Sequence, residues 1–389
     1  MSADWYDLGG RLRAARCGQP IARLRHAPAP APVTPVAVRA RSTRHGVTVA
    51  AATPGTGEEH ATGTDALDML RRMGVTLTAS TAPTLVIEDG STVAALHGLA
   101  RAVGTAHRAE DVAAALAWYA DRADYPHGRA VLAVPRACAA RWYTGDVPDA
   151  ERTAATWRRW LTVPDDTTTG MLTLAGIVTA GDPLPYLDTL TEGDTYTWAR
   201  AADDHTAGRD WRTPDTTARA ALGLRDRCNA ADLYAAALLT DPLARRRAVH
   251  TGHVTTGTAR VLDDRMRRVQ VTCPRLDCRL RPGTKITGWV GAPETIVPTW
   301  TATVETITAT GGTLTITATG VTGAHARPTT GQTVALHAAA PDPWQQRRSR
   351  SAYLRLYADR RSWLTTGRTP TPTRREVPLE VLVAGAEQD

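Results

Sequence analysis

The sequence predicts an α+β protein of several domains: a small α/β domain, a mostly helical middle and a C-terminal small antiparallel β-barrel. Three observations support this fold class. Apolar strand segments alternate with helical segments in residues 46–149, helical periodicity dominates residues 150–261, and a period of two residues governs residues 262–340. A chain of 389 residues is long enough for this division.

The first 45 residues are expected to form a basic arm rich in Pro, Ala and Arg. Alternating prolines at residues 27–36 favour an extended polyproline geometry. Residues 1–57 contain eight arginines and two acids, which supply +6 of the net charge of +7. The arginines of this arm are Arg11, Arg13, Arg16, Arg23, Arg25, Arg39, Arg41 and Arg44.

The domain of residues 46–149 shows strands in alternation with helices. Residues 46–52, 84–90 and 129–135 are apolar and short, as in buried strands. Residues 91–104 and 109–124 between them have helical periodicity. This order predicts a small, at least partly parallel sheet.

The domain of residues 150–261 has the spacing of amphipathic helices. In residues 154–161, Ala154, Trp157 and Leu161 share one helical face, so Trp157 is interpreted as a core residue and not as a platform for nucleobases. Pro242 is expected to divide a second helical stretch, because its ring blocks the helical hydrogen bond.

The domain of residues 262–340 alternates apolar and polar residues. Residues 268–273 and 275–281 are predicted as its first two strands. In the threonine-rich hairpin that follows, the apolar phase slips near Glu305 and Thr306, which indicates a β-bulge. Five or six such strands predict a compact barrel.

Residues 341–389 are expected to form a basic amphipathic helix and one last strand. The arginines of this segment before the final proline-rich link are Arg347, Arg348, Arg350, Arg355, Arg360, Arg361 and Arg368. They would line the polar side of the helix.

Glu88 and Asp89 lie at the carboxyl end of an apolar strand, where ligands usually bind in open α/β sheets. The stretch resembles the haloacid-dehalogenase motif DxDGT in its second half only, because Ile87 replaces the nucleophilic aspartate. The two carboxylates could hold Mg²⁺ in a metal-dependent enzyme. The alternative, which we favour, is a turn followed by a helix N-cap at Ser91.

His250 and His253 are spaced as in some metal sites, but no third ligand accompanies them. They are interpreted as residues at a helix end, where a positive imidazole is favourable. Cys273 and Cys278 have no second cysteine pair to complete a zinc site. The sequence therefore assigns no metal, no cofactor and no catalytic residue.

Five scattered cysteines indicate a reducing compartment and not a disulfide scaffold. No continuous apolar stretch reaches the length of a membrane span. The protein is therefore expected to be cytoplasmic and without contact to a membrane. One lysine, no phenylalanine and abundant Ala, Arg and Thr are typical of high-GC genomes, such as those of actinobacteria and their plasmids or phages.

The arginines favour non-enzymatic binding of nucleic acid through backbone phosphates. Besides the arm, a second basic surface is predicted on the first two barrel strands, formed by Arg265, Arg267, Arg268, Arg275, Arg279 and Arg281. The same charge could bind an acidic protein surface. One alternative function is therefore a structural or assembly component of a phage or secretion-like particle, and a metal-dependent enzyme is another.

Overall fold

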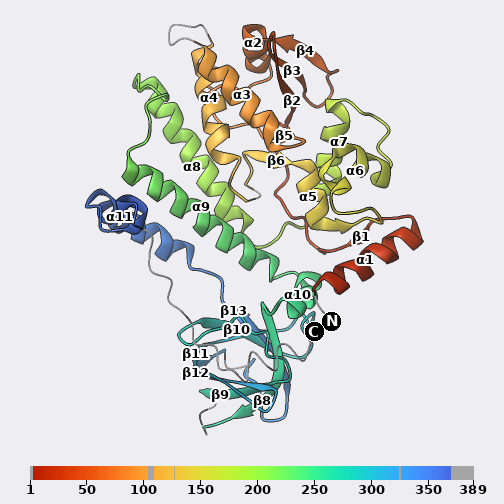
Figure 1. Cartoon of the computed structure of the whole chain (residues 1–389), viewed down its shortest axis with the longest axis vertical. Coiled ribbons are helices and arrows are strands. Elements are labelled where there is room, and N and C mark those ends of the chain that lie inside the picture. Colours follow the sequence, from red (N-terminus) through yellow and green to blue (C-terminus); the bar gives the residue numbers. More distant parts are fainter. Residues whose placement is uncertain are drawn as a thin grey trace. The chain divides into compact units, whose positions relative to one another are not determined.

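The computed structural model describes residues 3–103, 109–126, 128–263, 265, 267–323 and 326–368 (Figure 1). They form two compact units. We call Met1–Gly9, Ala235–Asp342 and Thr366–Asp389 the barrel unit, and Gly10–Tyr234 with Pro343–Thr365 the α/β unit. The sheets and helices of these units confirm the predicted α+β multidomain class.

The α/β unit is built on a five-stranded sheet of order β4-β3-β2-β5-β6. Its strands are β2 (Val36–Thr43), β3 (Gly46–Ala52), β4 (Glu59–Thr62), β5 (Leu85–Ile87) and β6 (Val131–Ala133). β2, β5 and β6 run parallel, whereas β3 is antiparallel to both β2 and β4. The sheet is therefore partly parallel, as the alternation of strands and helices predicted.

The expected separation of residues 1–45 as an arm is wrong, because β2 is the middle strand of this sheet. Val36, Ala37 and Val38 are fully buried, since helices cover both faces of the sheet at this strand. Ala27 and Ala29 of the proline-rich stretch are buried as well. The prolines therefore belong to a packed connection that leads into the sheet.

Helices cover the two faces of the sheet in two groups. One group consists of α2 (Thr64–Arg72), α3 (Gly90–Ala102) and α4 (Glu110–Arg122), and the other of α5 (Val134–Arg141), α6 (Ala154–Leu161) and α7 (Thr168–Thr179). Leu85 and Ile87 of β5 pack in the core of the first group, and Val86 packs in that of the second. Trp157 is fully buried in the second core, as its spacing predicted.

Asp111, in the first turn of α4, connects this helix to the end of α2. Arg71 and Thr76 both donate hydrogen bonds to its carboxylate. Burial raises the pKa of Asp111, but these hydrogen bonds outweigh burial and hold the pKa below its ordinary value.

The remaining helices of the α/β unit are α8 (Leu187–Thr206), most of α9 (Thr217–Leu238), α11 (Pro343–Ala358) and α12 (Trp363–Thr366). Asp194 of α8 accepts hydrogen bonds from Arg122 of α4, in an ion pair of 2.6 Å between two buried side chains. Tyr357 of α11 packs on Leu222 of α9. The predicted basic helix therefore exists, while the predicted last strand falls outside the described residues.

The chain enters the α/β unit through α1 (Ala3–Cys17), which begins in the barrel unit. β1 (Ile21–Ala22) then pairs with β7 (Trp142–Tyr143) in a two-stranded antiparallel sheet. Gly10 of α1 lies so close to the Tyr143 ring that a Cβ there would meet it at 2.8 Å.

The barrel unit contains a closed barrel of six antiparallel strands in the order β10-β11-β12-β9-β8-β13. The strands are β8 (Val254–Val261), β9 (Arg268–Cys273), β10 (Lys285–Val290), β11 (Trp300–Thr310), β12 (Thr313–Thr322) and β13 (Thr333–Ala338). The barrel thus starts at Val254 and not at residue 262. Residues 275–281, predicted as a strand, form none, and β8 provides the sixth strand instead.

The hairpin of β11 and β12 matches its sequence pattern closely. The register shifts between Val304 and Thr306, which confirms the predicted bulge. Gly311 and Gly312 form the turn with φ values of 59° and 75°, a combination that favours glycine. Leu314 and Ile316 point into the barrel core, so the intervening threonines lie on its outer side.

One outer side of the barrel is covered within its own unit. Ala248 of α10 (Pro242–Ala248) packs against Val254, Trp289 and Ala335 of β8, β10 and β13. The guanidinium of Arg245 lies 4.4 Å from the centre of the Trp289 ring. This packing covers the outer side of the barrel at β8, β10 and β13.

Candidate nucleic-acid interface

The predicted basic surface of the barrel consists of two groups of arginines at the two ends of β9. The strand begins at Arg268 and ends at Cys273. Its six residues separate the two ends by roughly 20 Å, at about 3.3 Å per residue. The prediction that all six arginines lie on two adjacent strands is wrong, because only Arg268 belongs to a strand.

The first group lies at the connection between β8 and β9. Oδ1 of Asp263 accepts the backbone N–H groups of Arg267 and Arg268, at 2.7 and 2.9 Å. The Arg268 side chain forms an ion pair of 2.9 Å with Glu305 of β11. Arg265 and Arg267 are exposed, and neither forms an ion pair with a carboxylate of the described residues.

The sequence reasoning missed two further arginines of this group. Arg260 is exposed on β8, and its register partner on β9 is Gln270. Arg327 donates a hydrogen bond of 3.3 Å to the backbone carbonyl of Arg265. Arg260 lies on β8, which has no regular alternation of buried and exposed residues, and Arg327 lies in a loop, so the sequence pattern indicated neither.

The second group lies on the connection between β9 and β10. Arg275 folds back on Asp277, with two hydrogen bonds of 2.9 and 2.5 Å. Burial raises the pKa of Asp277, but the hydrogen bond from Arg275 outweighs burial and lowers it. Because this local pair and Pro274 interrupt the extended backbone, no strand forms here. Arg279 and Arg281 are exposed, and within the described residues they form no ion pair with a carboxylate. Arg279 does donate a hydrogen bond of 2.9 Å to the backbone carbonyl of Thr251 through Nε and contacts His253, so only part of its guanidinium remains available.

The outer side of β9 between the two groups is polar and uncharged. Gln270 and Thr272 occupy it, and their register partners on β12 are Thr317 and Thr315. Thr317 is buried although it lies on the outer side, while Thr272 is exposed. Hydroxyl and amide groups can donate to phosphate oxygens but offer no surface for stacking bases.

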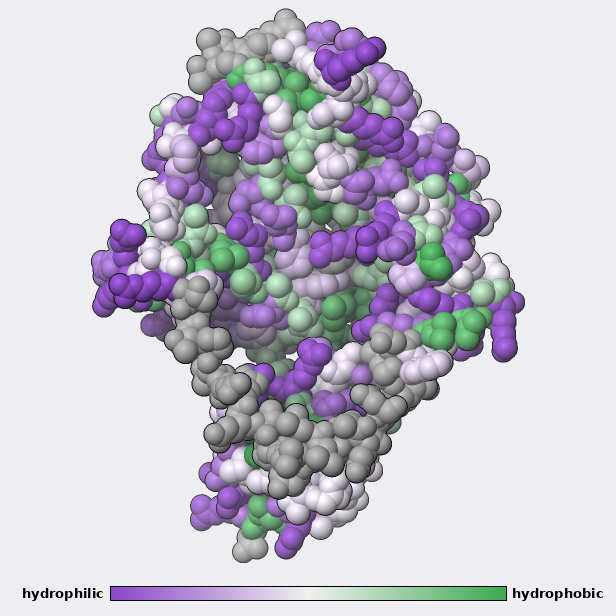
Figure 2. All heavy atoms as spheres, in the orientation of Figure 1, coloured by the Kyte–Doolittle hydropathy of each residue, from purple (hydrophilic) through white to green (hydrophobic). Residues whose placement is uncertain are grey.

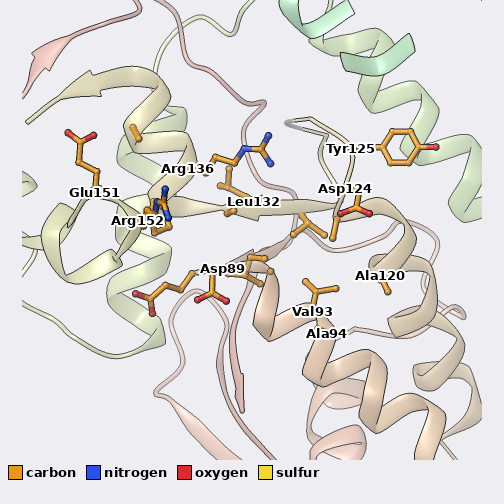
Figure 3. A pocket seen from close by; sticks show the side chains of 18 of the residues that line it. Asp89, Val93, Ala94, Ala120, Asp124, Tyr125, Leu132, Arg136, Glu151 and Arg152 are labelled. Carbon is orange, nitrogen blue, oxygen red and sulfur yellow. The ribbon is translucent and has the colours of Figure 1, made fainter. Parts of the chain in front are cut away.

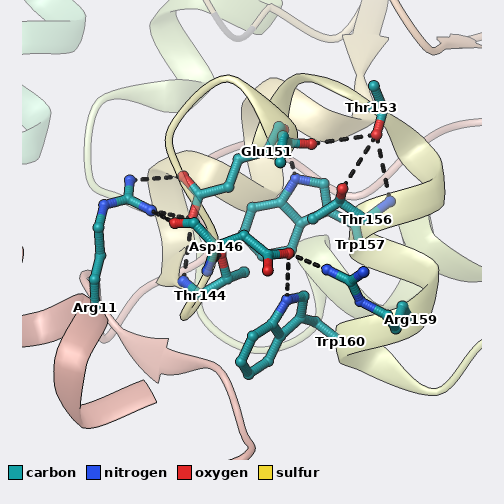
Figure 4. A network of polar contacts seen from close by, with 10 residues as sticks. Arg11, Thr144, Asp146, Glu151, Thr153, Thr156, Trp157, Arg159 and Trp160 are labelled. Carbon is teal, nitrogen blue, oxygen red and sulfur yellow. Dashed lines mark hydrogen bonds and ion pairs between the residues drawn. The ribbon is translucent and has the colours of Figure 1, made fainter. Parts of the chain in front are cut away.

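The arginines of the first 45 residues belong to the α/β unit, and Arg11, Arg23 and Arg39 are held by polar contacts with distant parts of the chain. Arg11 forms two hydrogen bonds, of 2.7 and 2.8 Å, with the two carboxylate oxygens of Glu151 (Figure 4). Glu151 is only 3% exposed and also accepts the backbone N–H and the hydroxyl of Thr144. Arg11 therefore holds a buried carboxylate and is not available to phosphate.

Arg39 and Arg23 are also occupied. Arg39 donates to the backbone carbonyl of Asp166 at 2.8 Å, and its Nε lies 3.9 Å from Glu88. Arg23 donates to the carbonyl of Ala139 and stacks over a tyrosine ring. The remaining arginines of this segment are exposed, namely Arg13, Arg16, Arg25, Arg41 and Arg44.

The two carboxylates after β5 have structural partners. Asp89 caps α3 by accepting the backbone N–H of Ser91 at 2.7 Å, so the cap is Asp89 and not Ser91. Glu88 accepts the backbone N–H of Ala154 at 2.8 Å. The residues that the structure describes contain no group of three or more His, Cys, Asp or Glu side chains placed to bind a metal ion.

The two histidines do not act as a pair. The His250 ring stacks on Tyr6 at 5.1 Å, and His253 contacts Thr251 and Arg279. Burial and the charge of Arg279 lower the pKa of His253, so the positive imidazole expected at a helix end is disfavoured there. Burial raises the pKa of Cys273 to about 12, which leaves this thiol protonated.

Within the described ranges, no helix has both the length and the apolar character needed to cross a bilayer. On the face drawn in Figure 2, hydrophilic side chains are interspersed with apolar ones. Comparison of the chain with protein-family models, with curated proteins and with solved structures gives no match.

Proposed function

We propose that the barrel binds the phosphate backbone of nucleic acid without catalysis, through the arginines at the two ends of β9. One observation supports this function above the others. Four exposed arginines flank a polar, uncharged strand surface and have no carboxylate partner among the described residues: Arg265, Arg267, Arg279 and Arg281. The barrel sequence from residue 254 to 338 has nine basic and five acidic side chains, a net charge of +4.

The uncharged surface between the arginines can contact a phosphate backbone but offers no stacking surface for bases. No aromatic side chain lies on the outer side of β9, so bases have nothing to stack on there. The affinity would therefore be largely independent of the nucleotide sequence of the bound nucleic acid. With four phosphate contacts, log K should fall with log salt at a slope of about −3 to −4, depending on the strandedness of the nucleic acid.

The test compares two variants with the same change in net charge. In the barrel variant Arg265, Arg267, Arg279 and Arg281 become Gln, and in the control variant Arg13, Arg16, Arg41 and Arg44 become Gln. Fluorescence anisotropy with a labelled duplex and a labelled single strand is measured between about 50 and 200 mM salt. We expect the barrel variant to lose affinity and most of the salt slope, while the control stays close to the wild type. Equal losses in both variants would show that only total charge matters, and two unchanged variants would exclude this interface.

An assembly component remains the second candidate, and α1 provides its support. Trp5, Leu8 and Leu12 are exposed apolar side chains at spacings of three and four residues, so they share one face of this helix. Such a face is typical of a protein contact. If this function is correct, the nuclease-treated protein should self-associate in analytical ultracentrifugation, and replacing the three residues by Ser should leave a monomer. A monomeric wild type would contradict self-assembly through α1.

A further inference from the structure

A cavity of about 860 Å³ lies in the α/β unit, at the carboxyl ends of β5 and β6 (Figure 3). Its apolar part is formed by Ile87, Val93, Ala94, Ala120 and Leu132. Charged side chains complete it, including Asp124 from the connection after α4, Arg136 from α5, and Glu151 and Arg152. A space of this size accommodates a small-molecule ligand.

The position of the cavity follows from the topology of the sheet. The chain leaves β5 for α3, which packs on one face of the sheet with Val93 and Leu96. It leaves β6 for α5, which packs on the other face with Val134 and Cys138. Because β5 and β6 are parallel neighbours whose helices diverge, a crevice opens between them at their carboxyl ends. Open α/β sheets bind their ligands at such a switch point.

Phosphate is a poor ligand for this cavity. The N-terminus of α3 is already occupied, because the Asp89 carboxylate accepts the N–H of Ser91. The first turn of α5 contains Pro135, which lacks an N–H group. The connections after both strands also lack the glycine-rich loop that cradles a phosphate chain. A nucleotide would therefore find no backbone anion site here.

Two opposite charges remain without partners at the cavity. Arg136 of α5 and Asp124, just after α4, are exposed lining residues, and neither forms a hydrogen bond or an ion pair with another described residue. By contrast, Glu151 is held by Arg11, and Arg152 pairs with Asp149 at 3.3 Å. The unpaired guanidinium and carboxylate come from different elements, so each can bind a different end of one ligand.

We propose that this cavity binds a short zwitterionic peptide with apolar side chains. Arg136 would receive the terminal carboxylate, for which the planar guanidinium fork is suited. Asp124 would receive the terminal ammonium, and the apolar side chains would cover Val93, Ala120 and Leu132. The site belongs to the α/β unit and is independent of the proposed interface on the barrel.

Isothermal titration calorimetry with leucyl-alanyl-leucine tests this site on the full chain. The same tripeptide with an acetylated amine, with an amidated carboxylate, and adenosine monophosphate serve as comparisons. We expect saturable binding of the free peptide and a loss of about tenfold or more for each blocked end, because each block removes a charge-assisted hydrogen bond. Equal binding of the blocked peptides, binding of the nucleotide alone, or no binding of any probe would overturn the proposal.

Two variants test which side chain binds the carboxylate of the peptide and which binds its ammonium. In Arg136→Gln, the free acid and the amide should bind equally, while acetylation should still weaken binding. In Asp124→Asn, the free and the acetylated amine should bind equally. Arg101→Gln and Asp188→Asn change exposed charges outside the cavity and should bind as the wild type does. If both cavity variants still discriminate against both blocked ends, the assignment is wrong.

Discussion

Replacing Arg11 by Ala separates a structural arginine from a phosphate-binding one. The bidentate pair with Glu151 joins α1 to a carboxylate that is almost entirely buried. In the variant, Glu151 keeps its hydrogen bonds from Thr144 but loses the guanidinium of Arg11 that compensates its charge. Breaking a buried pair in this way costs about 3–5 kcal/mol. Because the Arg11 side chain is 15% exposed, water can replace part of the contact, and we expect about 2–4 kcal/mol.

Arg13→Ala is the matched control for this variant, because it removes the same charge from an exposed position of the same helix. Its stability should lie within about 0.5 kcal/mol of the wild type. Urea denaturation followed by tryptophan fluorescence measures both variants, and anisotropy measures their affinity for DNA. Arg11→Ala should lower the urea midpoint and leave the salt slope unchanged. An Arg11→Ala protein that is as stable as the wild type but binds DNA more weakly would refute the structural role of Arg11. It would support the prediction that the arginines of residues 1–45 bind nucleic acid.

Three further predictions concern the packing of each unit. Asp194→Ala should destabilise the α/β unit by about 3–5 kcal/mol in urea denaturation, because it leaves the buried Arg122 guanidinium unpaired. Replacing Arg122 by Met and Asp194 by Leu together should recover most of this loss. Gly288→Ala should destabilise the barrel by about 1–3 kcal/mol or more, because the Cβ of the alanine would lie 2.3 Å from the Trp300 ring. In thermal unfolding, Gly288→Ala should cost less stability in a Trp300→Leu background than in the wild type. The pKa of Asp111 is lowered in the folded state, so its carboxylate contributes stability above about pH 4 and loses it as the pH falls through the folded-state pKa. The free energy of unfolding of the wild type should therefore exceed that of Asp111→Asn by less at pH 3 than at pH 7.

The hairpin of the barrel could be predicted because its signals are local. The phase slip beside Val304 appears in the sequence as an out-of-step apolar residue, and the two glycines of the turn are adjacent. The strand β8 lacks such a signal. Val254 and Thr255 are consecutive buried residues, because α10 covers the outer side of this strand. A strand buried on both faces loses the period of two that identifies an exposed sheet.

The middle strand of the α/β sheet was hidden for a related reason. β2 follows a proline-rich stretch and contains Arg39 and Arg41, a composition that resembles an extended basic tail. Its parallel neighbour β5 is distant in the sequence, with Val36 opposite Leu85. Only the pairing of these strands shows that the segment is buried, and that pairing is not encoded in either segment alone.

The location of the cavity was partly predictable, but its ligand groups were not. Glu88 and Asp89 marked the carboxyl end of β5, where an open sheet binds ligands. Arg136 lies on α5 and Asp124 follows α4, and these two helices pack on opposite faces of the sheet. The sequence therefore indicated the edge of the sheet, whereas the two free charges required the topology.

Arg11 and Arg267 show why a count of arginines does not predict an interface. Both lie in arginine-rich stretches with a nearby acid, and nothing local distinguishes them. Glu151, 140 residues later, captures Arg11, whereas Oδ1 of the nearby Asp263 binds the backbone N–H groups of Arg267 and Arg268. The affinity for a polyanion depends on the guanidinium groups that remain after such internal contacts. Because long-range partners decide which groups remain, the most arginine-rich segment need not be the one that binds.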